Sequence, residues 1–250
     1  MKKRLSILML VARFTVYRVV LLVLGMSVAQ VGLFYLALRK GSSNPLDVLL
    51  DSSKFGFVAV IAFILLCVLL GKSANGSGGS VSAYTVDRLS VSEIEFTGWF
   101  ALYNGLMFLV FWLWEALTML SMCLIYVRLA PQEAVGPQTI FLTCYRSGYL
   151  HRLIPLADIS GWVRNGAFVV ALGICTATSA YHERSGRRAA AVWFMAVGAV
   201  EGVSGMRGSG DGFDVVFILW SILVTAVTVS VVISKEREIS KGGDRWVSGN

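Results

Sequence analysis

The stretch that decides the fold runs over residues 71–127 and has three parts: GKSANGSGGSVSA (71–83), YTVDRLSVSEIEF (84–96) and WFALYNGLMFLVFWLWEALTMLSMCLIYV (99–127). The first part has the Gly and Ser content of a flexible linker. The third part is apolar and longer than the roughly 20 residues with which a helix crosses a bilayer. The stretch therefore predicts a loop that passes directly into a membrane-spanning helix.

The composition identifies an integral membrane protein. Of 250 residues, 56% are hydrophobic and 15% are charged, and the mean hydropathy is +0.71, which is too apolar for a soluble domain. The apolar residues form several long runs separated by Gly, Ser and charged clusters, which is the pattern of membrane helices and not of a membrane barrel. We expect an all-α protein with a single membrane domain over residues 1–250.

The positions of the basic residues argue against nucleic acid as a partner, and the positions of the cysteines argue against disulfide bonds and a zinc site. A net charge of +7 would suggest nucleic acid as the partner of a soluble protein, but here Lys and Arg lie beside the apolar runs, where anionic lipid headgroups are the simpler partner. We therefore expect membrane lipids and no nucleic acid. The four cysteines are isolated from one another, so neither a disulfide framework nor a zinc site is predicted; they are Cys67, Cys123, Cys144 and Cys175.

Apolar runs predict six membrane spans and two segments that lie along the membrane surface. Residues 2–17 place basic side chains on one side of a helix and apolar ones on another, as an N-terminal amphipathic interfacial helix does. Residues 138–163 are apolar but interrupted by charges and by Pro155, and they predict short interfacial helices on the outer face. The predicted spans cover about residues 19–38, 55–70, 98–127, 165–181, 189–205 and 213–233.

Six spans place both termini on the same side of the membrane, and the basic residues indicate which side. Lys and Arg are more frequent in the segments that share a side with the termini than in the segments on the other side. Because cytoplasmic loops carry an excess of Lys and Arg, we expect both termini in the cytoplasm and a multi-pass protein of the cell membrane.

Motifs for nucleotide binding and metal catalysis are incomplete. GKS at residues 71–73 ends like a phosphate-binding loop, but Leu66 stands where the first glycine of G-x-x-x-x-G-K-S belongs. HE at residues 182–183 begins like the zinc motif H-E-x-x-H, yet no second histidine follows it. We therefore expect no catalytic, metal-binding or cofactor-binding residues in this chain, and no enzyme activity of its own.

Glu115 is the best candidate for a functional residue within a span. A carboxylate there costs about 2.5–3.5 kcal/mol on insertion scales, so it should face protein or water and not lipid. Helical periodicity places it on one stripe with other residues, which makes a polar seam on an aromatic helix. One interpretation is a substrate path; the other is a carboxyl group that is protonated, or hydrogen-bonded to a neighbouring span, and serves packing. The predicted path consists of Asn104, Phe108, Phe111, Glu115 and Thr118.

The loop before the third span predicts a contact surface for a partner protein. Residues 80–95 are too polar for a span, but they carry enough apolar side chains to dock onto another protein. Thr85 or Ser90 can cap a short helix with acidic side chains near its first turn. An ordinary juxtamembrane turn is the alternative interpretation. The predicted coupling residues are Tyr84, Asp87, Arg88, Leu89, Val91, Ser92 and Glu93.

This combination resembles the membrane subunit of an ATP-binding-cassette exporter of the type-two permease class. The resemblance rests on the basic N-terminal segment, six spans with both ends inside, and YTVDRLSVSEIEFTGWFALYNGL before a long third span. In that class the loop after the second span commonly reads leucine, proline, valine or isoleucine, serine and a basic residue, and it forms a coupling helix. Leu89, Val91 and Ser92 match that pattern. Ser90 replaces the proline, and Glu93 replaces the basic residue.

The resemblance implies a mechanism of alternating access. ATP and Mg²⁺ bound between two partner ATPase subunits would draw these subunits together, and the helix around residues 87–93 would move with them. The third span would then tilt and open a path between two permease subunits, in a homodimer or a heterodimer, with Glu115 and Asn104 lining or gating it. The chain itself would hydrolyse nothing.

Two other functions fit the same spans. An ion-gradient-driven secondary transporter or channel would use Glu115 as its titrating group, although such folds usually show internal repeats and more charge within the membrane. A non-transporting partner in a membrane sensor or immunity complex needs only the spans and one docking loop. An exporter subunit binds a separate ATPase, and a secondary transporter transports without one. A sensor partner neither binds an ATPase nor transports.

Overall fold

The computed structural model describes residues 2–40, 45–52, 54–73, 93–130, 135–156, 158–184 and 211–247. Within these residues the chain is helical and forms no strand, so the predicted all-α class is confirmed for the described part. The helices are α1 (Lys2–Lys40), α2 (Leu46–Ser52), α3 (Phe55–Ser73), α5 (Glu93–Leu129), α6 (Thr139–Arg146), α7 (Gly148–Leu153), α8 (Ile159–Arg184) and α10 (Asp211–Val247).

In the described part of the chain, five helices are long and apolar enough to cross a membrane. This is the architecture of a multi-pass α-helical membrane protein. The predicted span at residues 189–205 lies outside the described residues. The five candidate spans are Thr15–Arg39, Phe55–Lys72, Ile94–Leu129, Ile159–His182 and Asp214–Ser234.

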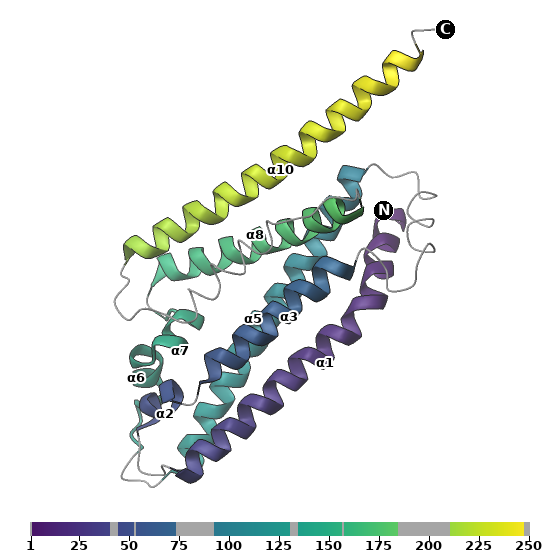
Figure 1. The fold of residues 1–250 in the computed structure, drawn as a ribbon. Coiled ribbons are helices and arrows are strands. Elements are labelled where there is room, and N and C mark those ends of the chain that lie inside the picture. The colour runs from purple at the N-terminus through teal and green to yellow at the C-terminus, as the bar shows by residue number, and fades with distance from the viewer. Residues whose placement is uncertain are drawn as a thin grey trace.

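The long helices form a bundle with short helices gathered at one end (Figure 1). α1, α3 and α5 run alongside one another, and α8 packs against both α5 and α10. α10 lies along the outer edge of the bundle and extends past α8 at its C-terminal end. α2, α6 and α7 lie where α1 and α5 end, so a small cap of short helices covers that end.

Two clusters of buried apolar side chains hold these helices together. The first lies between α1, α3, α5 and α8 and includes Leu66 and Phe108. The second joins α1 and α5 to the short helices and includes Met122 and Leu150, both fully buried. Because lipid is as apolar as these side chains, close packing and interhelical hydrogen bonds stabilise the contacts within the membrane. The second cluster fixes α7 against α5, next to Glu115.

α5 and α8 approach each other closely at Gly173. A Cβ atom at this position would lie 2.8 Å from the carbonyl oxygen of Ala101 and 2.8 Å from the Cα atom of Gly105. Small residues at such points let membrane helices bring their backbones together. The same contact brings Asn104 of α5 within hydrogen-bonding distance of Thr176 of α8.

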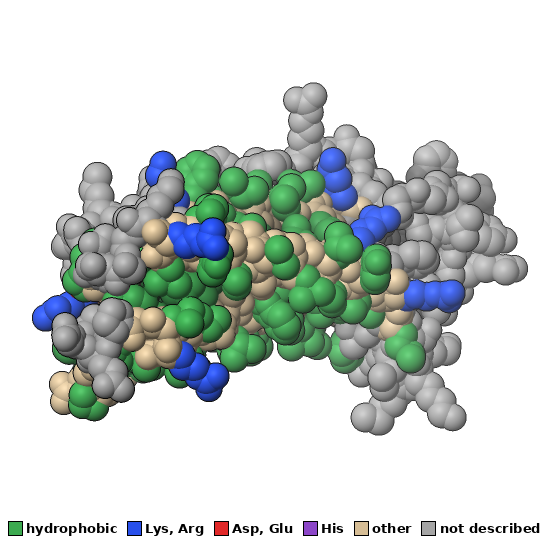
Figure 2. Space-filling model, turned by 90° about the horizontal axis from the view of Figure 1, so that it is seen from below, with side chains coloured by type: hydrophobic (Ala, Val, Ile, Leu, Met, Phe, Trp, Pro, Cys, Tyr) green, Lys and Arg blue, Asp and Glu red, His purple; other side chains and the backbone are tan. Residues whose placement is uncertain are grey.

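The outward faces of the bundle are strongly apolar. α10 is the clearest case, since only 17% of the most apolar window of its span is buried inside the protein. Val216, Leu219 and Leu223 are among its exposed side chains. Figure 2 shows one face on which hydrophobic side chains occupy the middle, while Lys and Arg lie towards the two ends. Such a distribution suits a hydrocarbon layer between two headgroup regions.

The N-terminal helix differs from the predicted pair of elements. α1 is continuous from Lys2 to Lys40, so the predicted interfacial helix at 2–17 and the predicted span at 19–38 form a single helix. Its candidate span begins at Thr15. The residue patterns of the amphipathic segment and of the apolar run both favour a helix. Because no proline lies between them to end it, one continuous helix forms.

The other boundaries agree with the predictions approximately. α5 and α8 begin before and end after the predicted spans at 98–127 and 165–181. Residues 138–163 form two short helices, α6 and α7, and their last residues belong to α8. α2 occupies part of the loop between the first two predicted spans, where no helix is predicted from the sequence.

Candidate functional site

Glu115 lies in the middle of α5, and its side chain is 2% exposed. Its Oε1 atom accepts two hydrogen bonds, one from Nε2 of Gln30 on α1 at 2.6 Å and one from the hydroxyl of Tyr149 on α7 at 2.5 Å. Three elements that are distant in sequence therefore meet at one carboxyl group. Hydrogen bonds to a charged acceptor are stronger than neutral ones, and they offset part of the cost of burying it.

Packing brings both donors to Glu115. Gln30 is fully buried on the part of α1 that contacts α5. Tyr149 sits in α7, whose N-terminus is capped by the hydroxyl of Ser147 and which is anchored by the buried Leu150. Burial and then the charge of Glu115 raise the pKa of Tyr149 well above its usual value. The phenol therefore stays protonated and donates a hydrogen bond to the carboxylate.

Several buried polar atoms along the bundle have no hydrogen-bond partner among the described residues. They include Oε2 of Glu115, Oε1 of Gln30 and Oδ1 of Asn104. Because buried polar atoms are nearly always paired, each unpaired one needs a reason. Both donors to Glu115 bind Oε1, which leaves Oε2 as the carboxyl oxygen available to a further partner.

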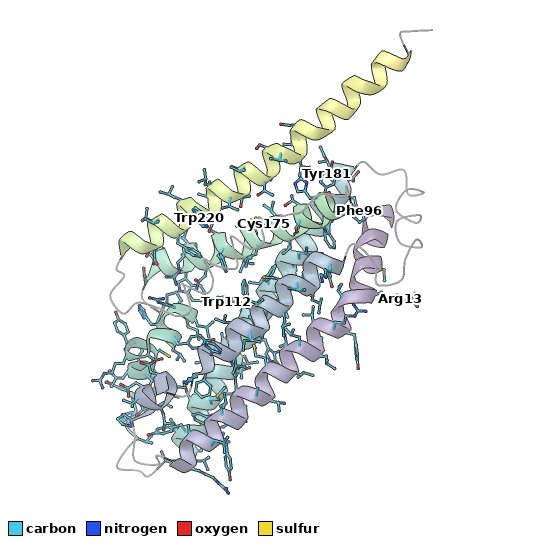
Figure 3. The ribbon with its side chains drawn as sticks, in the orientation of Figure 1. Arg13, Phe96, Trp112, Cys175, Tyr181 and Trp220 are labelled. Atoms are coloured by element: carbon cyan, nitrogen blue, oxygen red, sulfur yellow. The ribbon has the colours of Figure 1, made fainter. Side chains whose placement is uncertain are left out.

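A cavity of about 160 Å³ lies beside Glu115. An apolar cavity of this size takes a group about as large as benzene. Trp112 is one of the lining residues, and its ring meets that of Trp162 on α8 edge-on, with centroids 5.5 Å apart; Figure 3 labels Trp112 on the side of α5 that faces α8. The aromatic part of the lining is Phe63, Phe108, Phe111, Trp112, Tyr149, Phe168 and Phe217.

Polar residues of α7 and α8 also line the cavity, namely Arg152, Arg164 and Asn165. Arg164 forms an ion pair with Asp214, at the start of the span in α10, with 2.5 Å between nitrogen and oxygen. Arg164 and Asn165 both donate to the backbone carbonyl of Arg152. Burial and the charge of Arg164 lower the pKa of Arg152, whereas Asp214 acts in the opposite direction. This cluster ties α7 to the first turns of α8 and α10.

The five residues of the predicted path have two kinds of environment. Asn104 donates from Nδ2 to the hydroxyl oxygen of Thr176 on α8 at 2.9 Å. The hydroxyl of Thr118 lies 3.3 Å from that of Ser27 on α1. These two residues fasten α5 to its neighbours, and all five are buried, so the polar seam of α5 faces the interior of its own chain. The three that line the cavity are Phe108, Phe111 and Glu115.

The predicted coupling surface lies almost entirely outside the described residues. Glu93 is the exception, because it is the first residue of α5. The coupling role of this segment therefore stays a prediction. The residues of the surface outside the described part are Tyr84, Asp87, Arg88, Leu89, Val91 and Ser92.

Among the residues of the site that the sequence prediction omits are Gln30, Tyr149, Arg152, Arg164 and Asp214. Gln30 carries a usable signal, because a polar side chain inside a span tends to bond to a neighbouring helix. Tyr149 carries none, since it belongs to an interrupted segment whose contacts depend on how α7 packs against α5. Sequence periodicity finds the buried carboxyl but not its partners.

The described residues contain no group of three or more His, Cys, Asp or Glu side chains that could hold a metal ion. The four cysteines are all buried and free, and they occupy the core as small apolar side chains. Comparisons of the chain with protein-family models, with curated proteins and with solved structures find no match.

Proposed function

We propose that the chain is a permease subunit of an ATP-driven exporter, with a separate ATPase subunit and a second permease subunit as its partners. The observation that carries the proposal is the cavity between apolar helices, lined by Phe108, Phe111 and the buried Glu115. An ionisable residue that faces a cavity inside a span is the usual mark of a transport path. The resemblance of residues 84–106 to the coupling region of type-two permeases supports ATP as the energy source.

α5 offers a direct route from the ATPase to the cavity. It begins at Glu93, the last residue of the predicted coupling surface. Glu115 lies about 33 Å further along the same helix, at a rise of 1.5 Å per residue. Continuous backbone hydrogen bonds make such a helix move as one body, so displacement of its first turn would reach the cavity.

Opening of the cavity requires the contacts of Glu115 and Asn104 to separate. Gln30, Tyr149 and Thr176 hold these two side chains against α1, α7 and α8. A tilt of α5 would break these hydrogen bonds and widen the cavity, and the return of the helix would restore them. In this mechanism the polar seam stabilises the closed state and lines the path in the open state.

A secondary transporter driven by an ion gradient is the second candidate, and it is favoured by the Oε2 atom of Glu115, which has no partner within the described part of the chain. A carboxyl oxygen at a cavity can take up and release a cation or a proton. The two candidates differ in what drives transport. The secondary transporter works in vesicles that contain this chain alone, whereas the exporter needs the ATPase and ATP.

Affinity purification in mild detergent tests the first candidate. The tagged chain should retain an ATPase subunit, identified by mass spectrometry of the bound chains. Leu89→Asp should abolish this retention because it places a charge on the apolar docking surface. Gln138→Asp changes an exposed residue next to α6, at the end of the bundle away from the start of α5, and should leave retention unchanged. Retention of the ATPase by the Leu89→Asp variant would contradict the coupling assignment.

Glu115→Gln tests the path itself. In vesicles that hold the assembled exporter, this substitution should alter transport or substrate-stimulated ATP turnover while the ATPase stays bound. Unchanged transport and turnover would leave Glu115 with a structural role only. Uptake by the chain alone, driven by an ion gradient and lost in the Glu115→Gln variant, would favour the secondary transporter.

A further inference from the structure

The cavity beside Glu115 combines a carboxylate with aromatic walls. The ring centroid of Phe63 on α3 lies 5.9 Å from that of Phe108 and 6.0 Å from that of Phe168. Phe168 in turn lies 5.2 Å from Phe217 on α10. Aromatic faces carry partial negative charge, so they attract organic cations as well as apolar groups.

Glu115 supplies an acceptor that the described part of the protein leaves unused. Oε1 receives the hydrogen bonds of Gln30 and Tyr149, whereas Oε2 has no partner among the described residues. A buried carboxylate oxygen without a donor raises the free energy of the folded state. A charged donor that enters the cavity removes this cost, and an ammonium group makes the strongest hydrogen bond of this kind.

The arginines that line the same cavity are engaged by the protein. Arg164 binds Asp214, with side chains 13% and 7% exposed. Its other donors reach Asn165 and the backbone carbonyl of Arg152. Burial and the charge of Arg164 disfavour the charged form of Arg152, and only the charge of Asp214 favours it. These contacts make an anion a poor ligand, whereas Oε2 of Glu115, a residue that lines the cavity, has no partner among the described residues.

We propose that the cavity binds a small organic amine, with its ammonium group on Oε2 of Glu115 and its ring or short alkyl chain among the phenylalanine rings. The volume of about 160 Å³ suits one ring with a short side chain. Such an amine is then the substrate class of the proposed exporter. Its transport rests on the proposed function, but its binding to the chain does not.

Titration calorimetry of the purified chain in detergent tests the proposal with three ligands that share one ring. These are 2-phenylethylamine, the neutral 2-phenylethanol and the anionic 3-phenylpropionate, each corrected with empty micelles. The amine should bind about tenfold or more tighter than the alcohol, the factor expected for a charge-assisted hydrogen bond, and the carboxylate should bind weakest. Equal affinities of amine and alcohol, or no binding of the amine, would overturn the proposal.

Two substitutions locate the site. Glu115→Gln should weaken amine binding about tenfold or more, whereas Glu95→Gln removes a carboxylate from the same helix outside the cavity and should change nothing. Ala59 lines the cavity, so Ala59→Phe should fill it and abolish binding. Unchanged amine affinity in either Glu115→Gln or Ala59→Phe would contradict the site. If a variant fails to elute as a folded protein, the ranking of the three ligands on the unaltered chain decides alone.

Failure of this inference and failure of the proposed function give different results. The binding assay uses the chain alone, without an ATPase and without ATP. Amine binding by a chain that retains no ATPase would support the site and contradict the exporter. A retained ATPase with no amine binding would support the exporter and contradict the substrate class.

Discussion

At the scale of single residues, the buried carboxyl of Glu115 brings together side chains of three elements. A charge within a span costs about 2.5–3.5 kcal/mol on insertion scales, and donors from Gln30 and Tyr149 offset part of this cost. Removing a donor leaves the acceptor buried with fewer partners. The stability contributed by Gln30 should therefore depend on the presence of Glu115.

Replacing Gln30 by Leu should destabilise the protein. The substitution deletes the 2.6 Å hydrogen bond from Nε2 to Glu115, and we expect a loss of about 0.6–1.7 kcal/mol in the free energy of unfolding, as for other hydrogen bonds between membrane helices. Unfolding with sodium dodecyl sulfate in mixed micelles measures this loss. In a Glu115→Leu background the same substitution should cost less, and an equal cost in both backgrounds would show that the residues are not coupled.

The sequence predicts the burial of Glu115 but not the residues that bind it. Burial follows from the cost of a charge in lipid, which applies to any span whatever the fold. The partners depend on the rotation of α1 about its axis and on the docking of α7, and packing of the whole bundle sets both. Tyr149 reaches Glu115 only because Leu150 anchors its short helix in the second apolar cluster.

At the scale of elements, α8 begins at a capped turn. Oδ1 of Asp158 accepts hydrogen bonds from the backbone N–H of Ser160 at 3.0 Å and from its hydroxyl at 2.8 Å. The cap satisfies an amide group that the first turn of a helix leaves unpaired. Oδ2 of Asp214 lies 2.9 Å from the same hydroxyl, so its single proton is shared between the two carboxylates, and the cap adjoins the polar cluster around Arg164.

Replacing Asp158 by Ala should cost about 0.5–2 kcal/mol, as for other N-caps, and Asp158→Asn, which keeps a capping oxygen, should cost less. The hydrogen bonds from Ser160 lower the pKa of Asp158. The charged form therefore stabilises the fold fully above the unfolded-state pKa of about 3.9, and this contribution is lost as the pH falls through the lower folded-state value. The difference in melting temperature between the Ala variant and the unaltered protein should narrow from about pH 6 to about pH 3. A constant difference would contradict this role.

The contact between α5 and α8 predicts that Gly173 tolerates no side chain. In Gly173→Ala the new Cβ would lie 2.8 Å from the carbonyl oxygen of Ala101 and from the Cα atom of Gly105, so the helices must separate. We expect a loss of about 1–3 kcal/mol in detergent unfolding, as for other overpacked sites. Gly166→Ala on the same helix is the matched control, because its Cβ would meet nothing within 4 Å, and it should not destabilise the helix. Equal stabilities of the two variants would argue against the close contact.

Long helices are predicted better than their ends. Bilayer thickness sets the length of an apolar run, and a sequence displays that length directly. Helix ends depend on caps such as Asp158 and on tertiary contacts, which explains why α8 starts earlier than predicted and why α2 is missed. The predicted spans at 19–38, 55–70, 98–127, 165–181 and 213–233 all fall within helices of the structure.

At the scale of the whole molecule, the two ends of the bundle differ. The candidate span Ile94–Leu129 has 36 residues, which correspond to about 54 Å of helix, well beyond the roughly 30 Å of the hydrocarbon layer. Part of α5 therefore has to project from the bilayer. α2, α6 and α7 pack at the end where α1 and α5 finish, and the starts of α1 and α5 lie at the other end (Figure 1).

Because the two ends of the bundle lie on opposite sides of the membrane, the fold predicts which residues a reagent can label from outside the cell. Lys54 and Gln138 are exposed beside the short helices, and Lys72 is exposed at the opposite end of α3. From the positive-inside rule we expect the start of α1 in the cytoplasm. A membrane-impermeant maleimide should therefore label Lys54→Cys and Gln138→Cys in intact cells, and label Lys72→Cys only after permeabilisation. The native cysteines are buried and should add little background.

The labelling experiment tests the orientation of the bundle in the membrane and the packing of its short helices independently. Labelling of Lys72→Cys alone in intact cells would invert the orientation and leave the bundle unchanged. Lys54 lies between α2 and α3, and Gln138 directly precedes α6. Because α2 and α6 are in contact, these two positions must lie on the same side of the membrane in either orientation. Labelling of Lys54→Cys and Gln138→Cys from opposite sides would therefore contradict the packing of the short helices, and with it the position of Tyr149 beside Glu115.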